Sequence, residues 1–296
     1  MCEQGGAVLA VSLSALFALG SMFCAGLNDL IFKQYVVAGD RSKGAYIALI
    51  GVIWALFFYA MGSLSGGLRF DHDSVSYGLI SGGVLIIANI LLLEGFRGVD
   101  ASVGSTIYRL NFVVVVFLAP FFLAEQLTLR KLGGLGFATS SVFLMSWSHD
   151  SKPVPSGRTV PFFILLVIMA SILRGLMGFF YKVGTMHGVD ANAFLFINAL
   201  FWVIGGPIYS VIFEGGLRVN RSVIFYGIIS GLLVIGIASF LFLSVRAGEA
   251  IIAVPIAQLS FVVTAVLSVW VLKERFTSQK VLGIFCAVVT ILILSL

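Results

Sequence analysis

Apolar residues occur along this chain in ten runs, each close to the length that an α-helix needs to cross a lipid bilayer. A hydrocarbon core of about 30 Å takes roughly 20 residues of helix at about 1.5 Å per residue. Hydrophobic residues make up 60% of the chain and charged residues 10%, a balance that no water-soluble core can bury. The sequence therefore predicts an all-α polytopic membrane protein. The ten expected spans cover residues 7–36, 44–62, 75–93, 101–124, 132–147, 160–181, 191–213, 222–244, 250–272 and 281–296.

The connections between these spans are too short to fold as a soluble domain. The longest, residues 149–159, contains Pro153, Pro155 and Gly157 and is predicted to be a linker. The first span follows a head whose only charged side chain is Glu3, so it lacks the basic region of a signal peptide and is expected to be retained. The three cysteines form no CxxC pair, and we expect neither a disulfide framework nor a metal site.

An internal repeat organises the spans. A shift of 149 residues brings the two halves into register without a gap from Leu68 to Trp147. Apolar matches arise by chance between any two membrane helices, but charged residues and glycines in register rarely do, so the sequence indicates a duplicated unit of five helices. The clearest pairs are Lys33 with Lys182, Arg97 with Arg246, Glu125 with Glu274, Thr128 with Thr277, Lys131 with Lys280, and Gly134 with Gly283.

An odd number of helices in each unit means that the second copy enters the membrane from the opposite side. The predicted fold is therefore ten transmembrane helices arranged as two inverted five-helix repeats, residues 1–148 and 160–296, joined by the linker 149–159. Inverted repeats are common in secondary transporters, because two similar halves can expose one central site alternately to either side of the membrane. The symmetry predicts a transporter.

Two stretches of the chain resemble a known family. Residues 100–110 (DASVGSTIYRL), followed by Pro120 and residues 124–128 (AEQLT), are similar to the fourth and fifth helices of an EamA domain. Residues 248–250 (GEA), followed by Pro255 and residues 273–277 (KERFT), repeat the pattern. The whole chain thus resembles two EamA-like repeats of the drug/metabolite transporter superfamily, which implies a membrane carrier with cytoplasmic termini. The first repeat departs from the pattern, with Thr106 where the second has Pro255 and Arg109 where it has Gln258.

Arg109 is the clearest charge inside a predicted span. It lies about eight residues, or roughly 12 Å, from the start of its span near Ala101, and a charge at this depth costs at least about 2.5–3.5 kcal/mol. Ser102, Ser105 and Arg109 recur at i, i+3 and i+7, so they share one helix face. We expect this face to line a substrate-binding site, together with the neighbouring ring of Tyr108.

Arg174 is a second deep cation, about fourteen residues into the sixth span. On the first span, Ser14, Ser21 and Asn28 recur every seven residues and form a polar stripe beside Asp29. The further candidate substrate-binding residues are Arg174, Asn28, Asn89 and Gln258, and the candidate gating or coupling residues are Asp29, Glu94, Lys33 and Lys182.

These polar groups also have structural interpretations. Asp29 or Glu94 would neutralise Arg109 or Arg174 in a buried ion pair that only holds helices together. Lys33, Lys182 and Asp29 lie near span ends, where their side chains would extend to the membrane surface.

Glu125 and Glu274 each follow a span and precede a threonine by three residues. In one interpretation they cap the following helix or pair with neighbouring cations at the surface, and in the other they are gate carboxylates. Small residues allow helices to cross closely in a membrane, and this role is expected for Gly82, Gly83, Gly134, Gly136 and Gly283.

An excess of cations at membrane depth favours a solute that carries a carboxylate or a phosphate, because arginine offers a fork of donors to either group. The HExxH, P-loop, acid-cluster and GxSxG motifs are absent from the sequence, so we expect no enzyme activity, no cofactor and no ATP hydrolysis. The predicted function is secondary transport of a small polar metabolite, such as an amino acid, organic acid or other anionic solute. Alternating access at a central cavity would be driven by a coupled proton or an exchanged counter-solute.

Two other functions stay open on the sequence: an integral-membrane enzyme that modifies lipids or glycans, and a non-transporting membrane subunit or receptor. We expect a functional monomer in a bacterial inner membrane, with no nucleic-acid partner. More Lys and Arg lie in the connections opposite the termini than in those beside them, so the positive-inside rule places the termini outside. The family resemblance implies the reverse orientation.

Overall fold

The computed structural model describes residues 2–37, 42–99, 101–146, 160–272 and 277–295, and within these ranges the chain is helical apart from short connections. Eight helices are long and apolar enough to cross a membrane, and Thr106–Phe122 is a shorter apolar stretch. Together with α6 they account for the ten predicted spans and confirm an all-α polytopic membrane protein. The elements are α1 (Cys2–Val37), α2 (Lys43–Leu64), α3 (His72–Gly95), α4 (Ala101–Arg109), α5 (Phe112–Phe122), α6 (Leu129–Ser146), α7 (Val160–Met186), α8 (Ala191–Phe213), α9 (Arg221–Ala247), α10 (Ala250–Gln258), α11 (Ser260–Leu272) and α12 (Ser278–Ser295).

Two of the predicted spans are broken. The span expected at 101–124 is divided between α4 and α5, and the span expected at 250–272 is divided between α10 and α11. At both breaks the backbone tightens to three-residue hydrogen bonds, from the N–H of Leu110 to Ile107 and from the N–H of Leu259 to Ile256. Pro255 lies four residues before the second break, where it has no N–H to donate to the preceding turn. Both predicted spans are present, and each is interrupted by one tightened turn.

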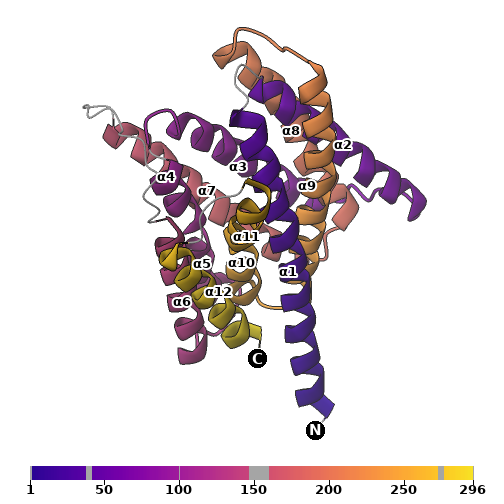
Figure 1. Ribbon diagram of the computed structural model, residues 1–296. Helices are drawn as coiled ribbons and strands as arrows, with labels where there is room; N and C mark the ends of the chain where they lie inside the picture. Colours follow the sequence, from indigo (N-terminus) through magenta and orange to yellow (C-terminus); the bar gives the residue numbers. More distant parts are fainter. Residues whose placement is uncertain (1, 38–41, 100, 147–159, 273–276, 296) are drawn as a thin grey trace.

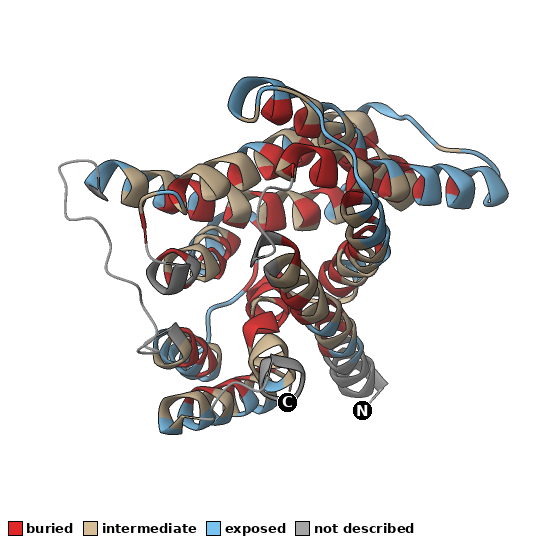
Figure 2. Ribbon diagram, turned by 45° about the horizontal axis from the view of Figure 1, so that its top comes forward, coloured by how far each residue is buried: buried red, intermediate tan, exposed pale blue. Residues whose placement is uncertain are grey.

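The repeat is visible in the helix bounds and in the helix packing. Residues 101–109 and 129–146 form α4 and α6, and a shift by 149 gives 250–258 and 278–295, which are α10 and α12. Helix α1 packs on α9 as α3 packs on α7, and α2 packs on its own counterpart α8. Each half is therefore built from the same six helical segments. Figure 2 shows buried residues along the faces where these helices meet.

Counterpart helices run antiparallel. Gly44, at the start of α2, lies against Ser210, near the end of α8. Gly51 lies about two turns further along α2 and packs against Val203, which is further from the end of α8. A two-fold axis that relates antiparallel helices is perpendicular to them, so in helices that cross a membrane it lies in the membrane plane. The predicted inversion of the two repeats is confirmed. Both chain ends lie at one end of the molecule, which we call the termini face (Figure 1).

The α2–α8 crossing brings two backbones into contact. A Cβ atom added to Gly206 of α8 would lie 2.5 Å from the backbone N of Ala48 and 2.5 Å from the carbonyl oxygen of Gly44 in α2. Only glycine fits such an approach, since real Cβ contacts are longer.

The predicted glycine crossings are only partly present. An added Cβ would lie 2.7 Å from Leu294 at Gly134, 2.5 Å from Met145 at Gly283 and 2.5 Å from Phe201 at Gly82, so these three do allow close packing. No described atom lies within 4 Å of a Cβ added to Gly136, and at Gly83 the nearest is 3.6 Å away. For Gly136 the predicted packing role is wrong.

Glu214, directly after α8, caps the N-terminal end of α2 on the face opposite the termini. Its carboxylate accepts hydrogen bonds from the Ser42 hydroxyl at 2.6 Å, the Ser210 hydroxyl at 2.8 Å and the Lys43 N–H at 2.7 Å. Burial raises the pKa of Glu214, but these hydrogen bonds outweigh it and hold the pKa below its ordinary value. Because the pKa of Glu214 is lower in the folded protein than in the unfolded chain, its ionised form stabilises the fold at pH values above the unfolded pKa. This contribution is lost as the pH falls through the folded pKa.

We expect Glu214→Gln to lower the free energy of unfolding by about 1–2 kcal/mol at neutral pH, because hydrogen bonds to a charged acceptor become bonds to a neutral one. The difference from the wild type should shrink as the pH falls through the lowered pKa of Glu214, because the native carboxyl is itself protonated below it. Thermal unfolding in detergent across this pH range measures both effects. A difference that stays constant with pH would contradict the assignment.

Candidate functional site

Arg109 is the last residue of α4, and its guanidinium group reaches the break in the other repeat. One terminal nitrogen donates to the Ser260 hydroxyl at 2.8 Å and to the Gln258 carbonyl at 3.5 Å, while the other donates to Asp29 Oδ2 at 2.7 Å. The guanidinium carbon also lies 5.1 Å from the ring centre of Phe261. Arg109 therefore joins α1 and the two helix breaks at one point. Broken helices in membrane transporters commonly form the solute site, because their ends offer free polar backbone groups at depth.

Two buried acceptors have no donor, and one of them, in Asn111, lies at the first break. Asn111 lies between α4 and α5 and is fully buried, and its Nδ2 donates to the Tyr108 carbonyl at 2.8 Å. Among the described residues, no donor reaches Oδ1 of Asn111 or Oδ1 of Asn28 on α1. Unsatisfied buried oxygens are rare in folded proteins and often mark a place for a ligand or a water molecule.

The acid that pairs with Arg109 is accessible. The Asp29 side chain is 37% exposed, whereas the Arg109 side chain is 18% exposed. The hydroxyl groups of Ser260 and Thr264 each lie 3.5 Å from Asp29 Oδ2. Asp29 lies three residues before the end of the apolar segment Leu13–Phe32, and a charged carboxylate there is stable only where it reaches water.

Arg174 of α7 is a second guanidinium group near the first break. Ser171, one turn before it, donates to the Ile107 carbonyl of α4 at 2.8 Å. Tyr108 lies within electrostatic range of Arg174 on one side and of the Arg109–Asp29 pair on the other. No carboxylate among the described residues forms an ion pair with Arg174.

The side chains of Glu94 and Asn89, both on α3, have partners on α3 itself or directly next to it. Glu94 forms an ion pair with Arg97 at 2.7 Å and accepts a hydrogen bond from Tyr209 at 3.0 Å. Asn89 donates to the Leu85 carbonyl of its own helix at 2.8 Å. Neither contacts Arg109 in the structure. Of the two acids expected to neutralise a deep arginine, Asp29 is the one that pairs with Arg109.

Four other residues were predicted to bind the solute or to act in gating. Gln258 contacts Arg109 through its backbone carbonyl. The side chains of Ser102, Ser105 and Lys33 lie outside the described residues, and their assignment stays a prediction.

Lys182 lies near the end of α7, at the termini face, and belongs to a different group of contacts from Arg109 of α4. Its ammonium group donates to the carbonyls of Val245 and Gly248 at 2.9 Å and 2.6 Å and lies 3.9 Å from Glu125 Oε1. The side chain is only 15% exposed, so the prediction that Lys182 extends to the membrane surface is wrong.

Glu125 accepts hydrogen bonds from the N–H groups of Ala250 at 2.7 Å and Ile251 at 2.9 Å. Glu125 therefore caps α10 of the other repeat, and the prediction that it caps the helix that follows it is wrong; Thr128 accepts from Lys131 at the start of that helix. Burial raises the pKa of Glu125, although the two N–H donors and Lys182 act against it.

Sequence reasoning missed five residues of these two clusters. The repeat contained a signal for two of them, because position 111 shifted by 149 is position 260, so the residues at the breaks are counterparts. The missed residues are Asn111, Ser260 and Thr264 near Arg109, and Lys131 and Glu249 near Glu125.

Comparison with known proteins is consistent with the repeat. The model of the EamA-like transporter family matches residues 12–147 and again residues 161–296. No curated protein matches the chain. A solved structure described only as "Crystal structure of protein" covers 95% of this chain and 95% of its own, with a TM-score of 0.81 and 12% sequence identity. At that identity the similarity concerns the fold alone.

Proposed function

Because the chain belongs to the EamA-like transporter family, we propose that it is a secondary carrier for a small polar solute with an anionic group, such as an amino acid or an organic acid. Alternating access at a site between the two helix breaks would move the solute across the membrane. This family consists of membrane transporters, and the reaction we assign is transport without chemical change.

The observation that carries the proposal is the meeting of both breaks at Arg109, with a second arginine nearby. Arg109 and Arg174 supply two guanidinium groups, and Asp29 supplies one carboxylate. The remaining positive charge favours an anionic group, which a guanidinium group binds through paired hydrogen bonds. The free oxygen of Asn111 at the first break would accept a hydrogen bond from a donor on the same solute, and we keep Asn28 as a further candidate on α1.

Asp29 is the residue that we assign to coupling. A solute anion that binds Arg109 competes with Asp29 for the same guanidinium group, and the displaced carboxylate is accessible enough to take up a proton. Exchange against a counter-solute uses the same competition without the proton. Because one chain contains both breaks, a monomer is sufficient, and we place it in a bacterial inner membrane.

Counterflow in proteoliposomes tests the proposal. Vesicles loaded with an unlabelled solute are diluted into the same solute in labelled form, using amino acids, organic acids, phosphorylated sugars and nucleosides as the panel. We expect accumulation of label only for solutes that carry a carboxylate or phosphate, because a neutral nucleoside offers nothing to the two guanidinium groups. Absence of counterflow across the panel, or counterflow of nucleosides alone, would contradict the proposal.

A further inference from the structure

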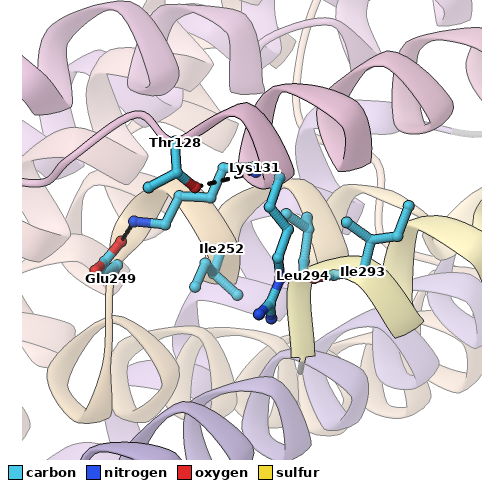
Figure 3. A pocket seen from close by; sticks show the side chains of 7 residues that line it. Thr128, Lys131, Glu249, Ile252, Ile293 and Leu294 are labelled. Atoms are coloured by element: carbon cyan, nitrogen blue, oxygen red, sulfur yellow. Dashed lines mark hydrogen bonds and ion pairs between the residues drawn. The ribbon is translucent and has the colours of Figure 1, made fainter.

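Four charged side chains form a cluster at the termini face, separate from the Arg109 site. Glu125 and Lys131 belong to the first repeat, and Lys182 and Glu249 belong to the second. Figure 3 shows Lys131 reaching from α6 to Glu249, with which it forms an ion pair. We call these four residues the termini-face cluster. The Lys131–Glu249 pair borders a pocket of about 250 Å³, which is also lined by Thr128, Arg130, Ile252, Ile293 and Leu294.

The contacts of Glu125 cross from one repeat to the other. Its two carboxylate oxygens accept from the N–H groups of Ala250 and Ile251, which are free donors because they lie in the first turn of α10. The helix dipole further favours a negative charge at this end. Glu125 therefore anchors the start of α10 to the α5–α6 turn of the first repeat.

Lys182 of α7 also contacts the junction between α9 and α10. Its ammonium group donates to the carbonyls of Val245 and Gly248, at the end of α9, while remaining 3.9 Å from Glu125. The Glu125 and Lys182 side chains are only 5% and 15% exposed. Breaking a buried charge pair leaves an uncompensated charge, so these contacts hold more firmly than ion pairs on the surface.

The backbone before Glu125 adopts an uncommon conformation. Ala124 has a φ of 53°, in the left-handed region that costs a residue with a Cβ atom about 1–2 kcal/mol. The chain leaves α5 at this point, and the conformation of Ala124 directs Glu125 towards the second repeat. Strain of this kind persists where surrounding contacts compensate for it, often at functional sites.

Helix α10 connects the cluster to the solute site. Its first N–H groups bind Glu125, and the carbonyl of its last residue, Gln258, accepts from Arg109. The residues between these ends are buried, from Ala250 to Ala257. One short, tightly packed helix thus has one end in each cluster, about 12 Å apart at 1.5 Å per residue.

We propose that the termini-face cluster is a lock that keeps the solute pathway closed on the membrane face bearing the termini, and that Glu125 is its central residue. The inference rests on the proposed carrier function, since an alternating pathway needs a closure on each face. The lock opens when the α5–α6 turn of the first repeat separates from the α9–α10 junction of the second. The contacts that Glu125 and Lys131 make with the second repeat suit this role, because they are polar and water can replace them on opening.

Accessibility of a cysteine at the solute site tests the lock without measuring transport. Ser260→Cys, placed in a chain whose Cys2, Cys24 and Cys286 are replaced by Ser, reports whether a membrane-impermeant maleimide reaches the site from the face that bears the C-terminus. We expect Glu125→Ala to speed this labelling at least about tenfold, because two N–H groups lose their acceptor and Lys182 loses its ion-pair partner in the closed form.

Glu214→Ala is the matched control. Glu214 also caps a helix of the other repeat, but on the opposite face, so labelling from the termini face should keep the unmodified rate. Labelling that rises equally in both variants would show general loosening of the fold and would overturn the assignment of the lock to Glu125.

A charge exchange gives a second test that does not depend on Glu125. Lys131→Glu places two acids together and should speed labelling, whereas Lys131→Glu combined with Glu249→Lys restores the pair and should return the rate towards that of the unmodified chain. The lock is refuted if labelling stays at the unmodified rate in both Glu125→Ala and Lys131→Glu. If the protein shows counterflow but labelling does not respond to these substitutions, the lock is refuted and the carrier function stands. If labelling responds but the protein shows no counterflow, the carrier function is refuted.

Discussion

Replacing Arg109 with Gln should abolish solute counterflow while the protein remains folded and monodisperse. The guanidinium group of Arg109 is the contact that joins α1 to both helix breaks, and a glutamine side chain is uncharged and cannot donate to Asp29 and Ser260 in the same geometry. Truncating one member of a partly buried charge pair that binds a ligand typically costs about 2 kcal/mol or more, so we expect a loss of transport of at least about 30-fold.

Two further variants separate the binding role of Arg109 from a structural one. Arg109→Gln combined with Asp29→Asn removes both charges, and it should recover any stability that the single change costs while leaving transport lost. Arg109→Lys keeps the charge but not the fork of donors, so partial transport is expected. Unchanged uptake by Arg109→Gln would remove Arg109 from the solute site.

Substitution of Gly206 should be among the most damaging single changes to folding. Even the Cβ atom of alanine would lie 2.5 Å from backbone atoms of both Ala48 and Gly44, and backbone cannot move aside as the end of a flexible side chain can. We expect Gly206→Ala to lower the free energy of unfolding by about 3 kcal/mol, the upper end of the usual cost of overpacking, and Gly206→Val to prevent recovery of monodisperse protein.

Gly136→Ala is the control for this prediction. No described atom lies within 4 Å of the added Cβ, and alanine is the better helix former by about 1 kcal/mol, so stability should stay equal or rise. Melting temperatures of the purified proteins in one detergent compare the two changes. Similar melting temperatures for Gly206→Ala and the wild type would contradict the close backbone contact between α2 and α8.

The membrane class, the ten spans and the inverted repeat were all accessible from the sequence, because hydropathy and the register of charged residues are properties of the chain itself. Arg109 was identifiable for the same reason, since a charge at that depth needs a compensating environment. Its acid was not, because Asp29 and Glu94 were equally plausible partners until the structure showed Glu94 beside Arg97 and Tyr209.

The helix breaks illustrate a different limit. The wider segments on either side of each break are apolar, so their mean hydropathy predicts one span, although Arg109 and Asn111 flank Leu110 and Gln258 and Ser260 flank Leu259. Pro255 is a signal for the second break, but the first repeat has Thr106 at the counterpart position and breaks nevertheless. In the first repeat we attribute the interruption of the helix to packing against the rest of the protein, because no proline there predicts it.

The partners of Glu125 were outside the reach of sequence reasoning for a related cause. The turn that contains Glu125 suggested a cap for the next helix, which is the local solution. The carboxylate instead binds Ala250 and Ile251, more than a hundred residues away in the chain. Such a contact depends on how the two repeats are placed against each other, which no local pattern specifies.

The contact between α2 and α8 runs along both helices, from Gly44 against Ser210 to Gly62 near Asn192. Two backbones that lie this close over several turns can neither slide past nor tilt against one another without steric overlap. Because one helix comes from each repeat, the pair would act as a single rigid unit. A rearrangement of the two halves would then have to move the other helices around this unit.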